Sequence, residues 1–325
     1  MQTLVLGTTG FIGGHIAQAA LVAGWPVRGL RRDPNSTGHL GDARVNWRTG
    51  DLNNGASLQA AMQGVDLVFH AAAYYPKSQP RLAVAEHVAR AQAEIDTVLA
   101  ALRAAGVPRL VFTSTLTTID LPPTGRLADE RDVYQPGDYA QSAYFEVKVA
   151  MENAVLAANR PGLEVVVTNP TAVFGPGDVH ITLGSLLMTA ARGYAFFWLP
   201  VTTNVVDVRD VAAGHIAAAK RGRPGERYIL GGHNLSVREA LTIANRVAGR
   251  RPPWLRLPVW PLEPFANLGD ALPFLPLPAN HLRSLKRMQA YNTAKAESEL
   301  SLRARPFDET VRDALDWFRR HGHLD

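Results

Sequence analysis

A tyrosine and a lysine four residues apart form the first group of side chains in this sequence that could carry out a reaction. Tyr144 and Lys148 lie in a stretch whose pattern predicts a helix over 139–158. Residues four apart share one face of a helix. A phenol has a pKa of about 10 in water, and a neighbouring ammonium group favours the phenolate. We therefore expect Lys148 to lower the pKa of Tyr144, so that the phenol acts as an acid or base near neutral pH.

A hydroxyl group that precedes this pair could hold the oxygen of a substrate. Thr115 follows a predicted strand over 109–113, and Ser114 is the alternative if the strand register differs. Alone, a threonine at the end of a strand is a common capping or turn residue. Because Tyr144 and Lys148 follow downstream, we predict that Thr115 joins them in one catalytic group.

Three glycines near the start of the chain predict the place of a dinucleotide. Gly7, Gly10 and Gly13 separate an apolar run over 4–6 from a helix predicted over 11–23. In this order, strand, glycine loop and helix let the backbone approach a pyrophosphate at the helix N-terminus. The spacing departs from the general G-x-G-x-x-G fingerprint. A plain strand–turn–helix is therefore the alternative unless downstream residues support the site.

Two arginines after the second predicted strand, 25–30, bear on the choice of cofactor. An acidic residue at this strand end binds the ribose 2′-hydroxyl of NAD, whereas an arginine accommodates the 2′-phosphate of NADP. Arg31 and Arg32 occupy this region, so we predict NADP in preference to NAD. A solvated turn through Asp33 and Pro34 is the alternative interpretation.

Strands and helices alternate regularly along the first half of the chain. Further strands are predicted over 45–47, 65–69 and 163–168, and further helices over 57–63 and 81–105. This alternation is typical of an α/β, Rossmann-type, doubly wound parallel sheet, whose strand ends bring their loops to one edge. His70 lies at this edge, where we expect a structural or cofactor-loop residue rather than a catalyst.

The pattern predicts two interleaved parts. Residues 1–175 are expected to form the NADP-binding Rossmann domain, and 176–325 a smaller, mixed substrate-binding lobe. Part of 205–235 is expected to return to the first domain. The later elements predicted are helices over 181–192, 210–220, 236–248 and 308–320 and a strand over 226–230.

Composition excludes several classes of function. The 325 residues include no cysteine, which removes disulfides, thiolate catalysis and cysteine-based zinc sites, and we expect no bound metal. The basic residues behind the net charge of +5 are scattered, so we expect no nucleic-acid partner. Residues 1–27 carry no charged side chain, but glycines interrupt them, so we expect neither a signal peptide nor a membrane segment and a cytoplasmic protein. The aromatic stretch within 250–289 is expected to pack in the lobe rather than contact a membrane.

Together these motifs resemble the extended short-chain dehydrogenase/reductase superfamily, also known as NAD-dependent epimerases/dehydratases. The resemblance runs through 1–215, and residues 27–34 are similar to the dihydroflavonol-4-reductase-like branch. The motifs that carry it are Gly7-x-x-Gly10-x-x-Gly13, Asp51-Leu52, His70-Ala71-Ala72-Ala73, Thr113-Ser114-Thr115, Tyr144-x-x-x-Lys148 and Asn169-Pro170.

The resemblance implies a role for each matching residue. Thr115, Tyr144 and Lys148 would be catalytic, with Lys148 also binding the nicotinamide ribose. It implies a homodimer formed through the helices over 81–105 and 139–158. The cofactor would contact Gly7, Thr9, Gly10, Phe11, Ile12, Gly13, Arg31, Arg32, Asp51, Leu52, Ala71, Ala72, Ala73, Thr113, Tyr144, Lys148, Pro170 and Val173. A small-molecule substrate would contact Tyr74, Leu116, Asn169 and Phe174.

Two departures from the family pattern shape the predicted function. Leu116 stands where sugar-nucleotide dehydratases carry an acidic residue, which argues against dehydration. The second part offers aromatic stretches such as 196–198 and no residues that match a nucleotide-diphosphate site. We predict an NADPH-dependent reductase of a carbonyl on a small, fairly apolar substrate. The alternatives are a nucleotide-sugar epimerase with tightly held NAD and a non-catalytic NADP-binding or sensing protein.

Overall fold

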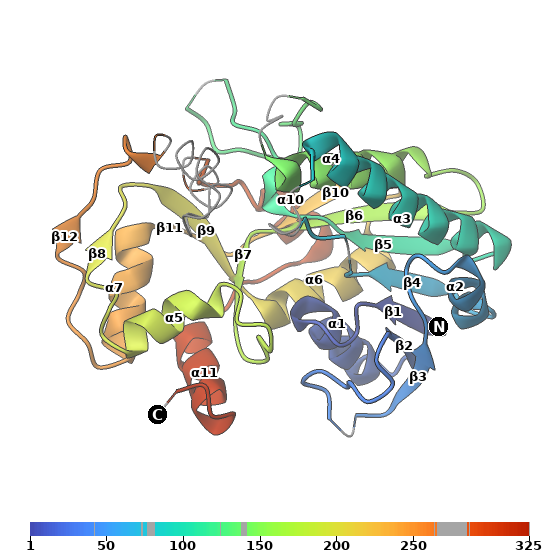
Figure 1. The fold of residues 1–325 in the computed structure, drawn as a ribbon, viewed down its shortest axis with the longest axis horizontal. Coiled ribbons are helices and arrows are strands. Elements are labelled where there is room, and N and C mark those ends of the chain that lie inside the picture. The colour runs from blue at the N-terminus through green and yellow to red at the C-terminus, as the bar shows by residue number, and fades with distance from the viewer. Residues whose placement is uncertain are drawn as a thin grey trace.

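A sheet of seven parallel strands forms the larger part of the molecule (Figure 1). The strand order is β10-β6-β5-β4-β1-β2-β3. Its strands are β1 (Thr3–Leu6), β2 (Val27–Arg31), β3 (Val45–Thr49), β4 (Leu67–His70), β5 (Arg109–Thr113), β6 (Glu164–Pro170) and β10 (Arg227–Leu230). The predicted Rossmann-type α/β fold is therefore confirmed.

This description rests on a computed structural model of the chain. The residues that it describes are 1–41, 43–72, 74–76, 82–123, 125–137, 142–262, 264, 285 and 287–324. In this part of the chain, no helix combines the length and the apolar composition needed to cross a bilayer.

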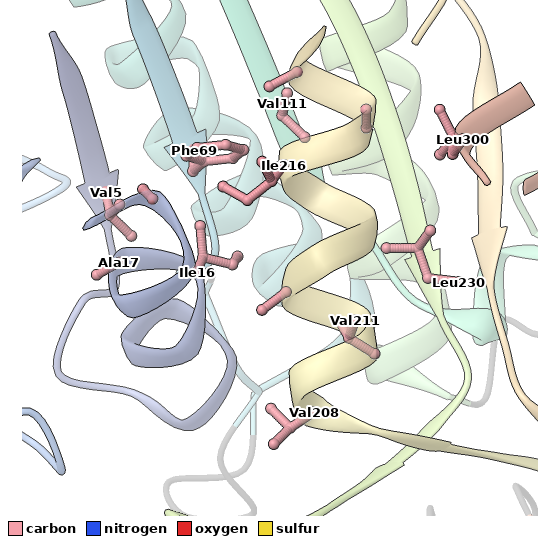
Figure 2. Packing of buried hydrophobic residues seen from close by; sticks show 14 of the residues in the cluster. Val5, Ile16, Ala17, Phe69, Val111, Val208, Val211, Ile216, Leu230 and Leu300 are labelled. Atoms are coloured by element: carbon pink, nitrogen blue, oxygen red, sulfur yellow. The ribbon is translucent and has the colours of Figure 1, made fainter. Parts of the chain in front are cut away.

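Helices cover both faces of the large sheet. On one face lie α1 (Phe11–Val22) and α6 (Val208–Arg221). On the other lie α2 (Gly55–Met62), α3 (Val84–Ala104) and α4 (Ala143–Ala157). Successive side chains of a strand point to opposite faces, so each strand supplies both layers. Figure 2 shows the first layer, which contains Val5, Ile16, Ala17, Phe69, Val111, Val208, Val211, Ile216, Leu230 and Leu300.

The turn between β1 and α1 requires glycine at two positions. Gly7 has a φ of +88°, and a Cβ there would lie 2.9 Å from backbone atoms of Ala71 and Ala72. A Cβ on Gly13 would overlap the carbonyl oxygen of Gly7. The strand order reverses between β1 and β4, which is where open α/β sheets bind their ligands. Gly7 therefore lets the turn after β1 approach the chain after β4, and Gly13 lets α1 approach the same turn.

A smaller lobe packs beside the carboxyl edge of the sheet (Figure 1). Its described residues form a three-stranded sheet, a two-stranded ribbon and three helices, and the larger of these sheets shares a separate apolar core with the helices. These elements are β7 (Ala172–Phe174), β9 (Thr202–Asp207) and β11 (His233–Ser236); β8 (Phe197–Trp198) and β12 (Leu255–Arg256); and α5 (Gly184–Ala191), α7 (Val237–Val247) and α11 (Phe307–Arg320). The sequence did not predict these strands. β7, β8 and β12 have only two or three residues, which offer too few alternating positions to recognise.

The chain passes between the two parts more than once. After β9 it enters α6, which packs against α1, and then β10, which pairs with β6 in the large sheet. It then returns to the lobe through β11, and later α10 (Ala294–Leu300) packs on α6 and β10. Segment 208–230 therefore belongs to the large sheet although the lobe precedes and follows it.

A buried ion pair fastens β10 to α4. Nε of Arg227 lies 2.7 Å from Oε1 of Glu152, with the geometry of an ion pair rather than of a linear hydrogen bond. Both side chains are more than nine-tenths buried. The second carboxylate oxygen of Glu152 accepts hydrogen bonds from Thr118 (2.7 Å) and from the amide of Asn169 (2.9 Å). One carboxylate thus connects α4, β6, β10 and the turn after β5.

Replacing Gly13 with alanine should destabilise the fold, because the new methyl group has no space beside Gly7. Overpacking of this kind costs about 1–3 kcal/mol, which urea unfolding would measure as a lower midpoint at unchanged slope. Gly55→Ala is the matched control, since its Cβ would meet only Thr97 at 3.8 Å. An equal loss in both variants would contradict the steric argument.

Replacing Glu152 with glutamine should cost about 3 kcal/mol of unfolding free energy, because Arg227 then remains buried without its counter-charge. Glu164→Gln serves as control, because the Glu164 side chain, which pairs with Arg109, is half-exposed. An exposed ion pair contributes at most about 1 kcal/mol to the free energy of unfolding. Thermal and urea unfolding would compare the two. A Glu152 variant as stable as the Glu164 variant would show that the buried pair is dispensable.

Candidate active site

The three predicted catalytic residues lie together at the carboxyl edge of the sheet. Tyr144 occupies the first turn of α4, and its phenol lies close enough to the side chain of Thr115 for Thr115 to lower its pKa. Thr115 lies two residues beyond the end of β5 and caps the short 3-10 helix η1 (Leu116–Thr118). One turn along α4, Nζ of Lys148 lies 5.8 Å from the centre of the Tyr144 ring. The arrangement presents two hydroxyls and one ammonium group to the same space.

Buried polar side chains fix the position of the backbone carbonyl of Thr115. Its carbonyl accepts hydrogen bonds from Thr118 (2.9 Å) and from the side-chain amide of Asn169 (3.2 Å). We predicted Asn169 as a substrate contact, but its side chain is completely buried and donates into this network. Asn169 therefore supports Thr115, and the prediction of a substrate contact is corrected.

Burial dominates the electrostatics of the pair. It raises the pKa of Tyr144 to about 12, and the nearby Tyr75 adds to this effect, whereas the side chain of Thr115 opposes it. Burial also lowers the pKa of Lys148 to about 8, although Glu94 favours the ammonium form. The expected lowering of the Tyr144 pKa is thus reversed in this state, because the cost of burying a phenolate is larger. Below about pH 8 the site holds a protonated phenol and an ammonium group.

Unsatisfied polar atoms at the ends of β4 and β5 indicate that this edge is built to receive a ligand. His70 is fully buried, and its pKa is lowered to about 3, first by burial and then by Lys148. Within the described residues, neither ring nitrogen of His70 has a hydrogen-bond partner, nor has Oγ of Ser114. Buried polar groups normally have partners, so a bound molecule would complete these.

The glycine loop beside them fits the diphosphate of a dinucleotide. Helix α1 begins after Gly10, without a capping side chain and without an acidic residue in its first turn. Its N–H groups and positive dipole end therefore favour an anion. Gly7 admits the close approach of Ala71 and Ala72, which form the opposite wall. Ala73, also predicted here, lies outside the described residues.

The two arginines after β2 differ in their surroundings. The Arg31 guanidinium lies 4.9 Å above the Trp47 ring and donates to the carbonyl of Ser36 (3.2 Å). Arg32 is exposed. Among the predicted adenosine contacts, Asp51 accepts the N–H of Asn53 (2.8 Å) in a turn, and Leu52 packs partly into the core. Arg32 is thus the arginine that is open to a phosphate.

Several predicted cofactor contacts have side chains engaged in the protein interior. The hydroxyl of Thr113 bonds Nε2 of His215 (2.8 Å), whose Nδ1 bonds the carbonyl of Val211 (2.8 Å). The side chain of Thr113 is therefore directed into the core, which corrects a side-chain role in cofactor binding. Phe11, Pro170 and Val173 are also buried, whereas Thr9 and Ile12 are partly exposed.

The predicted substrate contacts are only partly near the catalytic group. Phe174 is buried in the core of the lobe, 5.4 Å from the Phe307 ring, so this prediction is wrong. Tyr74 directs its hydroxyl to Nδ1 of His87 (2.7 Å). Leu116 is half-buried beside Thr115 and packs against the cluster around Ile119.

Two residues near the reacting pair were not among the predicted site residues. The ring of Tyr75 lies 5.3 Å from that of Tyr144 and is 59% exposed. Glu94 is buried, and its charge favours the ammonium form of Lys148. The second carried a signal: Glu94 lies on the apolar face of α3 formed by residues 91, 95, 98 and 102, where a carboxylate is rare unless it has a partner.

Comparisons with known proteins identify the family of the chain. The family described as the NAD dependent epimerase/dehydratase family matches residues 3–231. A Synechocystis protein named as a candidate dihydroflavonol 4-reductase is 32% identical over 98% of this chain and 95% of its own length. Sterol demethylase protein B of Methylococcus capsulatus is 27% identical over the whole of both chains. A Stigmatella aurantiaca ketoreductase of a farnesyl-substituted dihydroquinoline oxide is 30% identical over 97% of this chain and 96% of its own.

Solved structures share the whole fold. A nucleoside-diphosphate-sugar epimerase from Pseudomonas aeruginosa superposes with a TM-score of 0.86 and 26% identity, covering 100% of this chain and 99% of the other. UDP-glucose 4-epimerase of Thermus thermophilus, solved with NAD, reaches 0.72 at 23% identity and covers 98% and 99% of the two chains. The family match spans well over half of the chain. The protein therefore belongs to the NAD-dependent epimerase/dehydratase family of extended short-chain dehydrogenases/reductases and is an NAD(P)-dependent oxidoreductase.

Proposed function

We propose that the protein reduces a carbonyl group on a small, fairly apolar molecule with NADPH. The observation that supports this most is the approach of the Thr115 and Tyr144 side chains, close enough for Thr115 to lower the pKa of the phenol, with Lys148 one turn along the same helix. Two hydroxyls that face one point can hold a carbonyl oxygen, and one of them can give it a proton. The neighbouring glycine loop and α1 fit the diphosphate of the cofactor.

Each residue of the group has one task in this reaction. When bound, NADPH supplies the hydride that the carbonyl carbon receives. Thr115 donates a hydrogen bond to the carbonyl oxygen and orients it. Tyr144 gives its proton to the oxygen as negative charge develops there, and the ammonium group of Lys148 stabilises the phenolate that remains. A raised pKa keeps Tyr144 protonated before the transfer, which suits an acid.

An apolar substrate is supported by the surroundings of the group. The exposed ring of Tyr75 lies beside Tyr144 and offers apolar surface, and the half-buried Leu116 follows Thr115 in the chain. Two relatives carry names that refer to a sterol and to a farnesyl-substituted ring. We infer a substrate with an extended hydrocarbon or ring system that rests on these side chains while its carbonyl reaches Thr115 and Tyr144.

A nucleotide-sugar epimerase with retained NAD is the second candidate. It is favoured by the structure named nucleoside-diphosphate-sugar epimerase, which matches the whole chain. An epimerase returns its hydride to the substrate and consumes no cofactor. Chromatography of the nucleotide released from denatured protein separates the two: retained NAD(H) favours the epimerase, and an empty protein that oxidises added NADPH favours the reductase. Binding of NADP without turnover would indicate the sensing protein.

Replacing Tyr144 with phenylalanine should lower kcat about 10²- to 10⁴-fold, since it removes the proton donor. The dissociation constant for NADPH should change less than twofold. NADPH oxidation across a panel of ketosteroids and aryl ketones would measure the first, and cofactor fluorescence the second. Tyr194→Phe, at a 65% exposed lobe position, is the matched control and should retain activity. Full turnover by the Tyr144 variant would exclude this mechanism.

Replacing Arg32 with alanine should weaken NADP⁺ binding about 10- to 100-fold, because a charged hydrogen bond to phosphate contributes about 1.5–3 kcal/mol. Affinity for NAD⁺ should stay the same, since it lacks the 2′-phosphate. Calorimetric titration of both cofactors measures the difference, with Arg312→Ala on the distant α11 as control. Equal affinity of the unaltered protein for the two cofactors would contradict the proposed preference.

A further inference from the structure

A buried carboxylate lies behind the reacting pair. Glu94 projects from the middle of α3, the helix that packs along α4, and its side chain is only 7% exposed. Figure 1 shows the two helices side by side over the sheet. The backbone N–H of Tyr74 donates to Oε1 of Glu94 at 2.7 Å. A buried charge destabilises a protein unless it is paired and hydrogen-bonded, so groups of opposite charge are expected near Glu94.

The charged and titratable groups around Lys148 come from three elements. Glu94 faces it from α3, His70 from the end of β4, and Tyr144 from the preceding turn of α4 itself. His70 is neutral because its pKa is far below the working range, and Tyr144 is a neutral phenol. Among the described groups, Glu94 is thus the one whose charge favours the ammonium form of Lys148. Burial raises the pKa of Glu94, whereas the bond from Tyr74 and the charge of Lys148 lower it, and Asp51 and Arg32 act on it in opposite directions.

The same carboxylate also fixes the segment that touches Tyr144. Its bond to Tyr74 holds the backbone of this segment as it leaves the end of β4. The next residue, Tyr75, lies with its ring 5.3 Å from that of Tyr144. Glu94 therefore acts on the pair in two ways, by its charge on Lys148 and by position through Tyr74 and Tyr75.

We propose that Glu94 is a positioning residue of the reaction, which keeps Lys148 in its charged form and anchors Tyr75 against Tyr144. This rests on the proposed function, since it assigns Glu94 a part in the proton transfer by Tyr144. It touches neither substrate nor reacting atoms. Its removal should therefore alter the pH range of activity more than the affinity for substrate.

The first test compares the pH dependence of kcat in the unaltered enzyme, Glu94→Gln and Glu94→Asp. Loss of the negative charge disfavours the ammonium form, so the fall of kcat at rising pH should move down by about one pH unit in Glu94→Gln. That shift would mean about a fivefold loss of kcat at pH 8 and little loss at pH 6, with KM within twofold. Glu94→Asp keeps the charge on a shorter side chain and should restore most of the range.

The second test does not depend on turnover. Only the neutral amine reacts with acetylating reagents, so the midpoint of the labelling rate against pH reports the charge of each lysine, read by peptide mass spectrometry. In Glu94→Gln the Lys148 midpoint should fall by about one pH unit. Lys220, exposed on α6 beside Trp25, is the internal control and should not change.

These outcomes separate the two proposals. An enzyme that turns over no carbonyl substrate, yet shows the shifted Lys148 midpoint, would refute the proposed function and leave the charge relation intact. A midpoint and pH range that stay unchanged in Glu94→Gln, or in Glu94→Ala if the glutamine variant does not fold, would overturn the role of Glu94. A uniform loss of kcat at every pH would also overturn it, because that indicates general structural damage.

Discussion

The close approach of β1 and β4 at Gly7 is the constraint on which the rest of the site depends. Backbone atoms of Ala71 and Ala72 lie where any side chain at Gly7 would be. Because the two strands end together there, His70 and the residues after β5 reach the same edge. The site is thus assembled from chain segments far apart in sequence by one steric requirement, and its chemistry follows from what these strand ends carry.

Burial then decides the charge state of that edge. The same desolvation raises the pKa of Tyr144, so that it stays a protonated phenol. It lowers the pKa of His70, which stays uncharged, and it lowers the pKa of Lys148. Among the described residues at this edge, the ring nitrogens of His70 and Oγ of Ser114 have no hydrogen-bond partner in the protein. Such a site favours a ligand that brings anionic oxygens, which agrees with a dinucleotide. A reaction that transfers a proton outward from Tyr144 also fits this balance.

The order of motifs along the chain was sufficient to predict the fold and the three residues that meet at the sheet edge. Thr115, Tyr144 and Lys148 are predictable because helix spacing and strand ends fix where they lie. Phe174 and Asn169 were misplaced because the sequence does not reveal which face of a short strand, or which side of a strand end, is buried. The places of Tyr75 and Glu94 near Tyr144 and Lys148 depend on contacts between α3, α4 and the end of β4. The only sign of such tertiary contacts in the sequence is a charged residue within an apolar pattern. The pKa of Tyr144 was misjudged because burial is a property of the fold and not of the helix.

The repeated crossing of the chain between sheet and lobe has a consequence for how such a protein can change over evolutionary time. Since β10 comes from the middle of the second half and joins Glu152 through Arg227, the halves are not modules that recombination could exchange. A gene fragment ending at residue 175 would encode a sheet without its edge strand and with an unpaired carboxylate inside. New substrate preferences must therefore arise by substitution or loop insertion within the lobe, while the crossings stay fixed. Because the chain crosses between the two parts several times, we expect related proteins to differ in substrate while they keep the same cofactor-binding sheet.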